Sequence, residues 1–314
     1  MKNPNLDSVL AHLETFAIEQ DDVDGKAFIQ NTVDVNKYRR DHGRRLWHSL
    51  QIVNNLVTPG QPLRILELGA SPYFFTALLL HYIECEVTGV NVRAGVWPGA
   101  ANAEAERSSV RLRQGKDASA TTHDVEIYIF NIEKDPFPFP DDAFDLVLCM
   151  ETIEHLVYSP SHMLAESGRV LRPGGALLVS TPNAIDMNKT IRMIQNLPLG
   201  FYYSGYGVYG RHNREFAPDE LEKLVTACGF RVTKMWLKNP YLRFEYWPLR
   251  RLIASLVYTS TNLPLSYLRN KREYMYLLAE STRQHQAAYP ETLYLWRHLY
   301  PDYAQARVDE DDQG

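Results

Sequence analysis

The chain has 314 residues, of which 45% are hydrophobic and 23% charged, and its formal net charge is -5. This is the composition of a globular protein with a sizeable core, and the acidic balance argues against a nucleic acid partner. The N-terminus has no apolar signal core and no run of about 18 apolar residues occurs, so we expect a soluble, cytoplasmic protein without a membrane-spanning helix.

Two segments of helical pattern precede the first expected strand. The runs LDSVLAHLETF and RRLWHSLQIVNNLV, residues 6–16 and 44–57, both place apolar residues three and four positions apart. The second run ends before a Pro-Gly pair, which breaks a helix. We therefore expect residues 1–61 to form a helical extension in front of a domain that covers residues 62–280.

From residue 63 onward, short apolar runs alternate with segments of helical spacing. The expected strands are residues 63–69, 85–92, 125–132, 144–150, 175–182 and 230–237. The expected helices are residues 74–83, 161–171 and 216–230. Apolar strands that alternate with helices predict a parallel sheet buried on both faces, which is the doubly wound α/β class.

Polar residues follow three of these strands where the chain leaves the sheet. The run ILELGASPYFF turns at Gly69 into a helix that Pro72 is expected to start, and such a turn lets backbone N–H groups face a polar ligand. Asn91 ends the next strand about 20 residues later, where dinucleotide sites carry an acid for ribose hydroxyls. Asn131 ends the third strand, where a side-chain oxygen can accept from an adenine amine. Because ligands of open α/β sheets bind beyond these strand ends, the sequence predicts a site for a nucleotide-like ligand.

Four segments carry a resemblance to a known family. They are ILELGAS, FPFPDDAFDLVLCMETIEHL, ESGRVLRPGGALLVSTPN and RHNREFAPDELEKLVTACGF, and their order and spacing resemble the class I S-adenosylmethionine-dependent methyltransferases. The resemblance is to the broad bacterial group that includes ubiquinone-pathway O-methyltransferases and polysaccharide-pathway methyltransferases. It implies a seven-stranded, mostly parallel, Rossmann-like sheet over residues 62–280, with residues 273–280 as a final antiparallel strand and residues 240–270 as a helical insertion before it. Residues 281–314 are expected to add a C-terminal helix and an acidic tail.

The resemblance also implies S-adenosyl-L-methionine as the cofactor and assigns its binding residues position by position. The turn around the methionine part of the cofactor would be formed by Glu67, Gly69, Ala70 and Ser71. The remaining binding residues would be Asn91 at the ribose, Asn131 and Ile132 at the adenine, and Met150. The family usually carries an acid at both Asn positions and further glycines in the turn, so these departures leave open a low cofactor affinity or a non-catalytic relative.

The segment ETIEHL after the fourth strand is the expected place of reactivity. Glu151, Glu154 and His155 would share one face if a helix begins at the strand end. Their spacing resembles the metal-binding Glu-x-x-Glu-His of the small-RNA 2′-O-methyltransferases, and a divalent metal held there would lower the pKa of a hydroxyl. Without a metal, His155 is the first candidate for a general base and His212, in a later loop, is the second, with Glu151 as a further catalytic candidate.

These residues favour an O-methyltransferase that acts on a hydroxyl of a sugar, a glycan intermediate or a secondary metabolite. A His and two carboxylates follow the fourth strand, and the Asn-Pro-Pro-Tyr motif of enzymes that methylate amino groups is absent from the sequence. Three alternatives stay open. They are a quinone or phenol O-methyltransferase, a non-catalytic methyltransferase-like binding protein, and an RNA methyltransferase, which the acidic balance disfavours.

Two further segments are expected to border the site. Residues 200–213 are rich in Tyr and Gly and predict either a mobile lid or an ordinary loop. Between Arg231 and Arg272 there are nine Lys and Arg residues against one Glu. Within that basic stretch, residues 248–272 contain an apolar run with basic residues on both sides. The run is too short to cross a bilayer. We expect this run to make a peripheral contact with the inner face of a membrane, to cap the site, or to form a homodimer contact.

Overall fold

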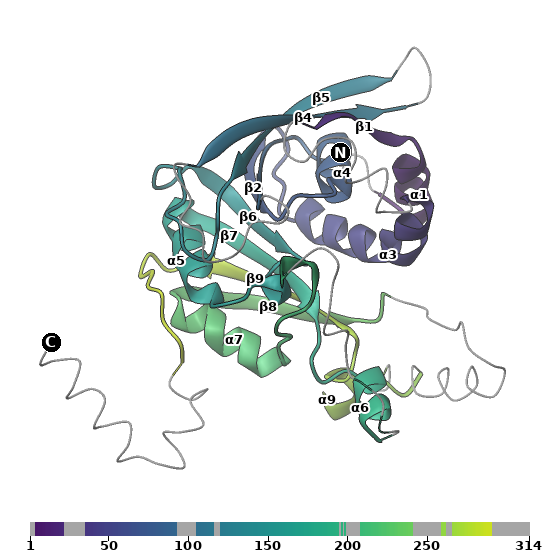
Figure 1. Cartoon of the computed structure of the whole chain (residues 1–314), viewed down its shortest axis with the longest axis vertical. Coiled ribbons are helices and arrows are strands. Elements are labelled where there is room, and N and C mark those ends of the chain that lie inside the picture. The colour runs from purple at the N-terminus through teal and green to yellow at the C-terminus, as the bar shows by residue number, and fades with distance from the viewer. Residues whose placement is uncertain are drawn as a thin grey trace, which may run out of the picture.

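The computed structural model describes residues 4–21, 35–92, 105–115, 120–194, 196, 198, 208–240, 259–261 and 266–290. In this part of the chain a single mixed sheet carries helices on both faces (Figure 1). The strands are β1 (Phe16–Asp21), β2 (Leu63–Leu68), β3 (Cys85–Asn91), β4 (Glu106–Gln114), β5 (Thr121–Ile129), β6 (Phe144–Met150), β7 (Leu171–Pro182), β8 (Phe230–Lys238) and β9 (Tyr274–Ser281). The helices are α1 (Leu6–Glu14), α3 (Val35–Asn54), α4 (Phe74–Tyr82), α5 (Pro160–Val170), α6 (Met187–Ile194), α7 (Pro218–Ala227) and α9 (Ser266–Arg269), with two 3-10 turns, η1 (Ile153–His155) and η2 (Val208–Gly210).

Seven of the strands form the sheet that the sequence predicts. Their order is β5-β3-β2-β6-β7-β9-β8. The neighbours from β5 to β7 pair in parallel, whereas β9 is antiparallel to both β7 and β8. The doubly wound, mostly parallel, Rossmann-like sheet is confirmed, and residues 274–281 are its antiparallel strand.

The sheet is wider than expected because β1 and β4 extend it beyond β5 to nine strands. Both added pairings are antiparallel, with Ala17 opposite Arg113 and Val110 opposite Val125. The expectation of a purely helical extension over residues 1–61 was therefore wrong, because this extension contributes an edge strand. β4 was missed because only Val110 and Leu112 are buried in a strand otherwise made of Ser, Arg and other polar residues.

Two cores lie on opposite faces of the sheet, and β6 separates them by strict alternation. Leu146 and Leu148 pack into the core shared with α1, α3 and α4, whereas Val147 and Cys149 pack into the core shared with α5 and α7. Side chains of a strand point alternately to its two faces, so a run of apolar residues is needed when both faces are covered. Because Val9 and Leu50 of the N-terminal helices join the first core, the extension packs directly on the sheet.

Two expected segments lie largely outside the described residues. Of the helical insertion at residues 240–270, the structure describes α9 and residues 259–261. Residues 283–290 are not helical, and the rest of the expected C-terminal helix and acidic tail lies outside the described residues. Among the helices that the structure does describe, none combines the length and the apolar character needed to cross a bilayer.

Candidate active site

The turn after β2 brings the ends of β2 and β6 into close contact. Gly69 has a φ of +73°, and a Cβ on it would lie 2.3 Å from Thr152 Oγ1. The Thr152 hydroxyl donates a hydrogen bond of 3.0 Å to the carbonyl of Leu68. Both the backbone conformation and the close approach therefore require glycine at this position.

The polar groups of this turn are satisfied inside the protein. The N–H groups of Gly69 and Ala70 donate to the carbonyl of Val90, at 2.8 and 3.1 Å. Asn91 accepts from the Ser71 N–H at 3.0 Å and donates to the Tyr73 hydroxyl at 2.9 Å. The expectation that these N–H groups face a ligand was wrong for Gly69, Ala70 and Ser71, because the end of β3 takes all three.

The start of α4 also differs from the expectation. The Ser71-Pro72 peptide bond is cis, and Tyr73 follows with a φ of 63°. The helix then begins at Phe74, so Pro72 precedes it by two residues instead of starting it. Tyr73 is buried directly before the first residue of α4, at a position where the resemblance implies glycine.

Asn131 lies just beyond β5 and is part of a second polar cluster. Its Oδ1 accepts from the Glu133 N–H at 2.9 Å, and its Nδ2 donates to the Tyr209 hydroxyl at 3.2 Å. The Tyr209 hydroxyl donates in turn to Glu133 Oε2 at 3.1 Å. Glu133 Oε1 accepts the N–H groups of Tyr158 and Ser159, just before α5. Tyr209 of η2 is thereby fixed against the end of β5.

Asn91 and Asn131 therefore end neighbouring strands, since Asn91 pairs with Ile129 of β5, but they bond to different partners. The carbonyl oxygen of each side chain accepts one N–H group, and an amide oxygen has two lone pairs. Each retains capacity for a hydroxyl or an amine of an adenosyl group. These two acceptor oxygens, at the carboxyl ends of adjacent strands, fit the hydrogen-bonding groups of an adenosyl ligand.

Glu67 and Glu151 are carboxyl groups at the carboxyl end of the parallel strands. Glu67 is buried, and the Glu151 side chain is 18% exposed. Burial raises the pKa of Glu67 to about 7, although the Thr76 hydroxyl donates to it at 2.6 Å. Burial also raises the pKa of Glu151 to about 8, against the opposing effect of the Arg45 guanidinium. Glu151 forms an ion pair with Arg45 and accepts from the Ser180 hydroxyl at 3.0 Å. Such shifts are typical of functional sites.

Sequence reasoning missed Arg45 of α3. Its guanidinium is buried and also donates to the hydroxyls of Tyr38 and Tyr274, at 3.1 and 3.2 Å. One signal for it exists in the sequence, because Arg45 shares a helical stripe with the buried Ser49 and Val53. A charged residue on such a stripe needs a buried partner, and here that partner is Glu151.

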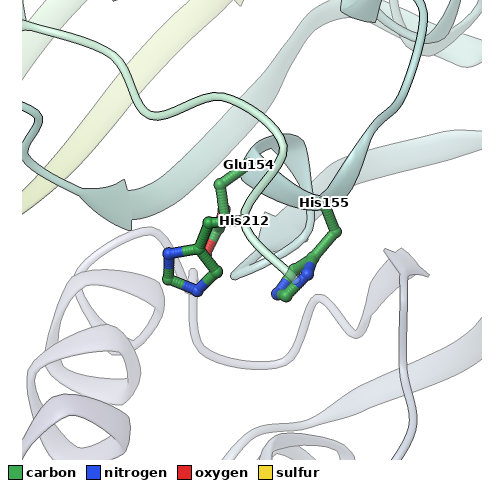
Figure 2. A group of neighbouring side chains, drawn as sticks. All are labelled: Glu154, His155 and His212. Carbon is green, nitrogen blue, oxygen red and sulfur yellow. The ribbon is translucent and has the colours of Figure 1, made fainter. Parts of the chain in front are cut away.

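The segment after β6 does not form the helix that the sequence predicts. Glu151 has a φ of 54°, and only residues 153–155 form a helical turn, η1. The expectation that Glu151, Glu154 and His155 share one helix face was therefore wrong. Glu151 turns toward Arg45, while Glu154 and His155 lie beside His212 from the loop before α7 (Figure 2).

Glu154, His155 and His212 form the tightest group of metal-ligating side chains among the described residues. One ligand atom from each lies within 4.8 Å of the other two. Glu154 is 1% exposed, and its Oε2 accepts from the Thr181 hydroxyl at 2.9 Å. Its Oε1 is buried and has no hydrogen-bond partner within the described part of the chain. We refer to these three residues as the Glu-His-His cluster.

The two histidines of this cluster are oriented through their Nδ1 atoms. His155 Nδ1 lies 2.9 Å from the carbonyl oxygen of Arg211, and His212 Nδ1 lies 2.7 Å from Glu215 Oε1. Because both partners only accept, Nδ1 carries the proton and Nε2 carries the lone pair in each neutral ring. Burial and the nearby His212 lower the pKa of His155 to about 4. Burial also lowers the pKa of His212, but Glu215 and Glu154 outweigh it and the net shift is upward.

The loop that carries His212 is held to η1 by backbone contacts. The N–H groups of Asn213 and Arg214 both donate to the carbonyl of Glu154, at 2.7 and 3.2 Å. The Asn213 side chain donates to the carbonyl of His155 at 2.8 Å. His212 thus reaches the end of β6 through the fold of its own loop, which no local spacing predicts. Met150, at the end of β6, packs partly buried against the core on the α3 side.

Comparisons with known proteins find similarity to methyltransferases over part of the chain. Residues 66–179 match the family model described as "Methyltransferase domain". The chain is 38% identical over 95 residues to a "Probable S-adenosylmethionine-dependent methyltransferase" of Mycolicibacterium smegmatis, and 34% identical over 106 residues to one of Mycobacterium tuberculosis. It is 30% identical over 98 residues to a "Ubiquinone biosynthesis O-methyltransferase" of Rhizobium leguminosarum bv. trifolii.

These matches are partial. They cover 30%, 34% and 29% of this chain and 32%, 33% and 35% of the three relatives, so the chain matches about a third of their length. Among solved structures, an S-adenosylmethionine-dependent methyltransferase from Archaeoglobus fulgidus has a TM-score of 0.46 at 15% identity, with 78% of this chain and 98% of that chain covered. One from Methanosarcina mazei has a TM-score of 0.44 at 17% identity, with 73% and 96% covered.

Proposed function

We propose that residues 66–179, which match the methyltransferase family model, belong to a class I S-adenosylmethionine-dependent methyltransferase domain, and that the chain transfers a methyl group to a hydroxyl oxygen. The proposed acceptor is a sugar, a glycan intermediate or a secondary metabolite. The observation that supports O-methylation is the Glu-His-His cluster at the end of β6, where the His155 imidazole, oriented by the Arg211 carbonyl, stands beside a buried carboxyl group. Removal of a hydroxyl proton needs such a base near the acceptor.

The proposed cofactor residues are those at the ends of β2, β3 and β5. S-adenosyl-L-methionine, when bound, supplies an electrophilic methyl group on a sulfonium. Asn91 Oδ1 and Asn131 Oδ1 retain acceptor capacity for the adenosyl part, and the Ile132 N–H follows Asn131 directly. Glu67 and Met150 are proposed for the methionine part, and Gly69, Ala70 and Ser71 are proposed to shape the turn beside it without donating their N–H groups.

The residues around the reacting hydroxyl are proposed to accept its proton and to hold it in line. His155 Nε2 is the proposed acceptor, because the Arg211 carbonyl fixes the proton of that ring on Nδ1. His212 is the competing candidate, since Glu215 orients its ring in the same way. Glu151 follows β6 directly and is paired with Arg45, and we propose that it positions the acceptor without taking the proton.

A binding measurement separates this proposal from a non-catalytic scaffold. Titration calorimetry with S-adenosylmethionine and S-adenosylhomocysteine is expected to show binding of both ligands to the purified chain. A mass spectrum of small molecules retained by the protein then gives candidate acceptors, including a quinone or phenol, the class suggested by the relative named for ubiquinone biosynthesis. Absence of binding at millimolar ligand would leave only the scaffold.

A divalent cation in the Glu-His-His cluster is the second candidate, and one observation favours it. Glu154 Oε1 is a buried carboxylate oxygen without a hydrogen-bond partner among the described residues, and such groups are rare. Both imidazoles donate their Nδ1–H to a fixed acceptor, which is the usual outer arrangement of metal-binding histidines. One carboxylate and two imidazoles suit zinc or a similar transition metal.

The cation is tested without an activity assay. Cobalt(II) is added to metal-free protein and its visible absorption is recorded, with metal content measured after dialysis. We expect Glu154→Gln and His212→Ala to lose the signal, and Glu151→Gln to keep it if the three ligands are those of the cluster. Loss of the signal in both Glu151→Gln and Glu154→Gln, with the signal kept in His212→Ala, would instead support the set Glu151, Glu154 and His155 that the sequence favours.

A further inference from the structure

Exposed apolar side chains of the described residues gather on one face of the molecule. Five large hydrophobic residues are exposed in the described part of the chain, and four of them lie on or next to α6 and α9: Ile185 (38%), Met193 (64%), Ile194 (78%) and Tyr267 (69%). The fifth, Tyr158, is 55% exposed and precedes α5. Figure 1 shows α6 and α9 side by side below the sheet. We call the four residues the α6–α9 face.

Backbone and side-chain contacts join the two helices into one unit. The N–H of Met187 donates to the carbonyl of Lys271 at 2.8 Å. The Lys271 ammonium lies 3.4 Å from the Thr190 hydroxyl and 5.6 Å from the centre of the Tyr267 ring. No residue of α6 is buried, so this helix presents apolar side chains to the outside. Exposed apolar groups in such a cluster mark an interaction surface.

The charges around this face are mainly positive. Residues 183–194 and 266–273 contain five basic residues, Lys189, Arg192, Arg269, Lys271 and Arg272, and two acids, Asp186 and Glu273. Asp186 is buried and paired with Lys189. Arg192 and Arg269 are exposed. Lys189 also pairs with Glu215 and Arg272 donates to two backbone carbonyls, so the exposed cations beside the apolar residues are Arg192 and Arg269.

We propose that the α6–α9 face docks on an anionic lipid surface. Apolar side chains on a short amphipathic helix enter the boundary between headgroups and acyl chains, and basic residues beside them attract anionic lipids. Contact with a second copy of this chain is less suitable, because a two-fold interface would bring Arg192 and Arg269 of both copies together. The charge and the apolar residues match a lipid surface on one and the same side of the molecule.

The position of the face relates it to the candidate active site. α6 follows β7 at the carboxyl end of the sheet, the end that carries the Glu-His-His cluster. Lys189 of α6 contacts Glu215 at 2.6 Å, and Glu215 accepts from His212. Docking would therefore place this end of the sheet next to the lipid surface. The proposal itself is independent of methyl transfer, since it concerns binding alone.

Vesicle flotation tests the proposal with the full chain. Wild-type protein is expected to float with vesicles of phosphatidylcholine and phosphatidylglycerol in equal amounts, and to stay unbound with phosphatidylcholine alone. The pair Met193→Ser and Ile194→Ser is expected to lower partitioning at least tenfold. The pair Arg192→Glu and Arg269→Glu is expected to lower it more than about 20-fold, since each basic residue contributes about fivefold.

Two matched controls separate docking from general effects. Tyr158→Ser removes the one exposed large apolar side chain of the described residues outside the face, and Lys223→Glu reverses an exposed charge on α7. Both are expected to bind vesicles like wild type, and all variants are compared by circular dichroism and thermal unfolding. The proposal is overturned if wild-type protein does not bind the anionic vesicles. It is also overturned if both pairs bind undiminished, or if light scattering shows that the apolar pair only abolishes a dimer.

Discussion

Carboxyl side chains at the two ends of the parallel strands have pKa values that are shifted in opposite directions. At the amino end of β6, Asp145 accepts the N–H and guanidinium of Arg64, at 2.7 and 3.1 Å, and also pairs with Arg172. These partners outweigh its partial burial and lower the pKa of Asp145 to about 2. At the carboxyl end, burial raises the pKa of Glu67 to about 7 and of Glu151 to about 8.

The difference lies mainly in the number of hydrogen-bond donors around each carboxyl group. The Asp145 side chain is only 11% exposed, but its several donors keep it charged, whereas Glu67 is buried with one side-chain donor and resists ionisation. Glu154 is the extreme case, because one of its oxygens has no partner among the described residues. The carboxylate at the amino end of the strands is thus charged and paired, whereas the carboxyl groups at the other end resist ionisation.

The largest effect is expected at the carboxyl end, for His155→Ala. If His155 takes the hydroxyl proton, this change lowers kcat by about 10²-fold or more, the scale of lost general-base catalysis. Single-turnover methyl transfer with the acceptor found by mass spectrometry measures it. His123→Ala, on β5 and opposite Leu112, is the control and is expected to keep the wild-type rate. An unchanged rate in His155→Ala would move the base to His212 or to the substrate itself.

Gly69→Ala is expected to have the next largest effect, on both stability and ligand binding. The change places a Cβ 2.3 Å from Thr152 Oγ1 at a φ of +73°. We expect a loss of about 3 kcal/mol in the free energy of unfolding, from left-handed strain and overpacking together. Binding of S-adenosylhomocysteine is expected to weaken at least tenfold.

Gly60→Ala is a matched control for this strain. Gly60 has nearly the same φ, +74°, but a Cβ on it would meet nothing within 4 Å. It is expected to cost about 1 kcal/mol in urea unfolding and to leave ligand binding unchanged. Equal losses in the two variants would show that Thr152 yields easily, and that the closeness of β2 and β6 is unimportant.

At the amino end, Asp145→Asn is expected to reduce stability without any effect on the site. Because the pKa of Asp145 is lowered by folding, its contribution is present above about pH 4 and is lost as the pH falls toward about 2. After solvent screening of its half-exposed arginines, we expect a loss of about 1 kcal/mol near pH 7. The loss should disappear in unfolding measured near pH 2. A difference that persists there would point to packing instead of charge.

The smallest effect is expected for Tyr209→Phe. This change removes the hydroxyl that joins Asn131 to Glu133. Loss of this link is expected to weaken S-adenosylhomocysteine binding about two- to fivefold, the range for one or two hydrogen bonds. Tyr128→Phe, which removes a hydroxyl that donates to Glu126 on the same strand at 3.3 Å, is the control. Tighter binding by Tyr209→Phe would mean that this hydroxyl competes with the ligand for Asn131.

The central strands could be predicted from the sequence because burial on both faces demands continuous apolar runs. In β6, Leu146, Val147 and Leu148 are all buried. A continuous apolar run this short indicates a buried strand, because helices are usually longer. β4 has no such signal, since its burial is confined to alternate positions in a polar strand. β1 and β4 also pair across about 90 residues of chain, which local patterns do not encode.

Only the part of the candidate site that is formed by residues close together in the sequence could be predicted. Glu154 and His155 were found because they are adjacent and follow a strand end. Their approach to His212, 57 residues further along from His155, depends on contacts of Asn213 with η1. The partner of Glu151 likewise comes from α3, so its ion pair with Arg45 needed the folded chain to be seen.

The position of β9 has a consequence for how the chain is made. β9 is bonded to β7 on one side and to β8 on the other, yet it is synthesised last of these strands. After β7 leaves the ribosome, roughly 90 further residues must be added before its partner appears, about 5 to 20 seconds at ordinary rates of translation. During that time one edge of β7 has no partner strand and can pair with another chain. We therefore expect chaperones to bind the nascent chain at this stage.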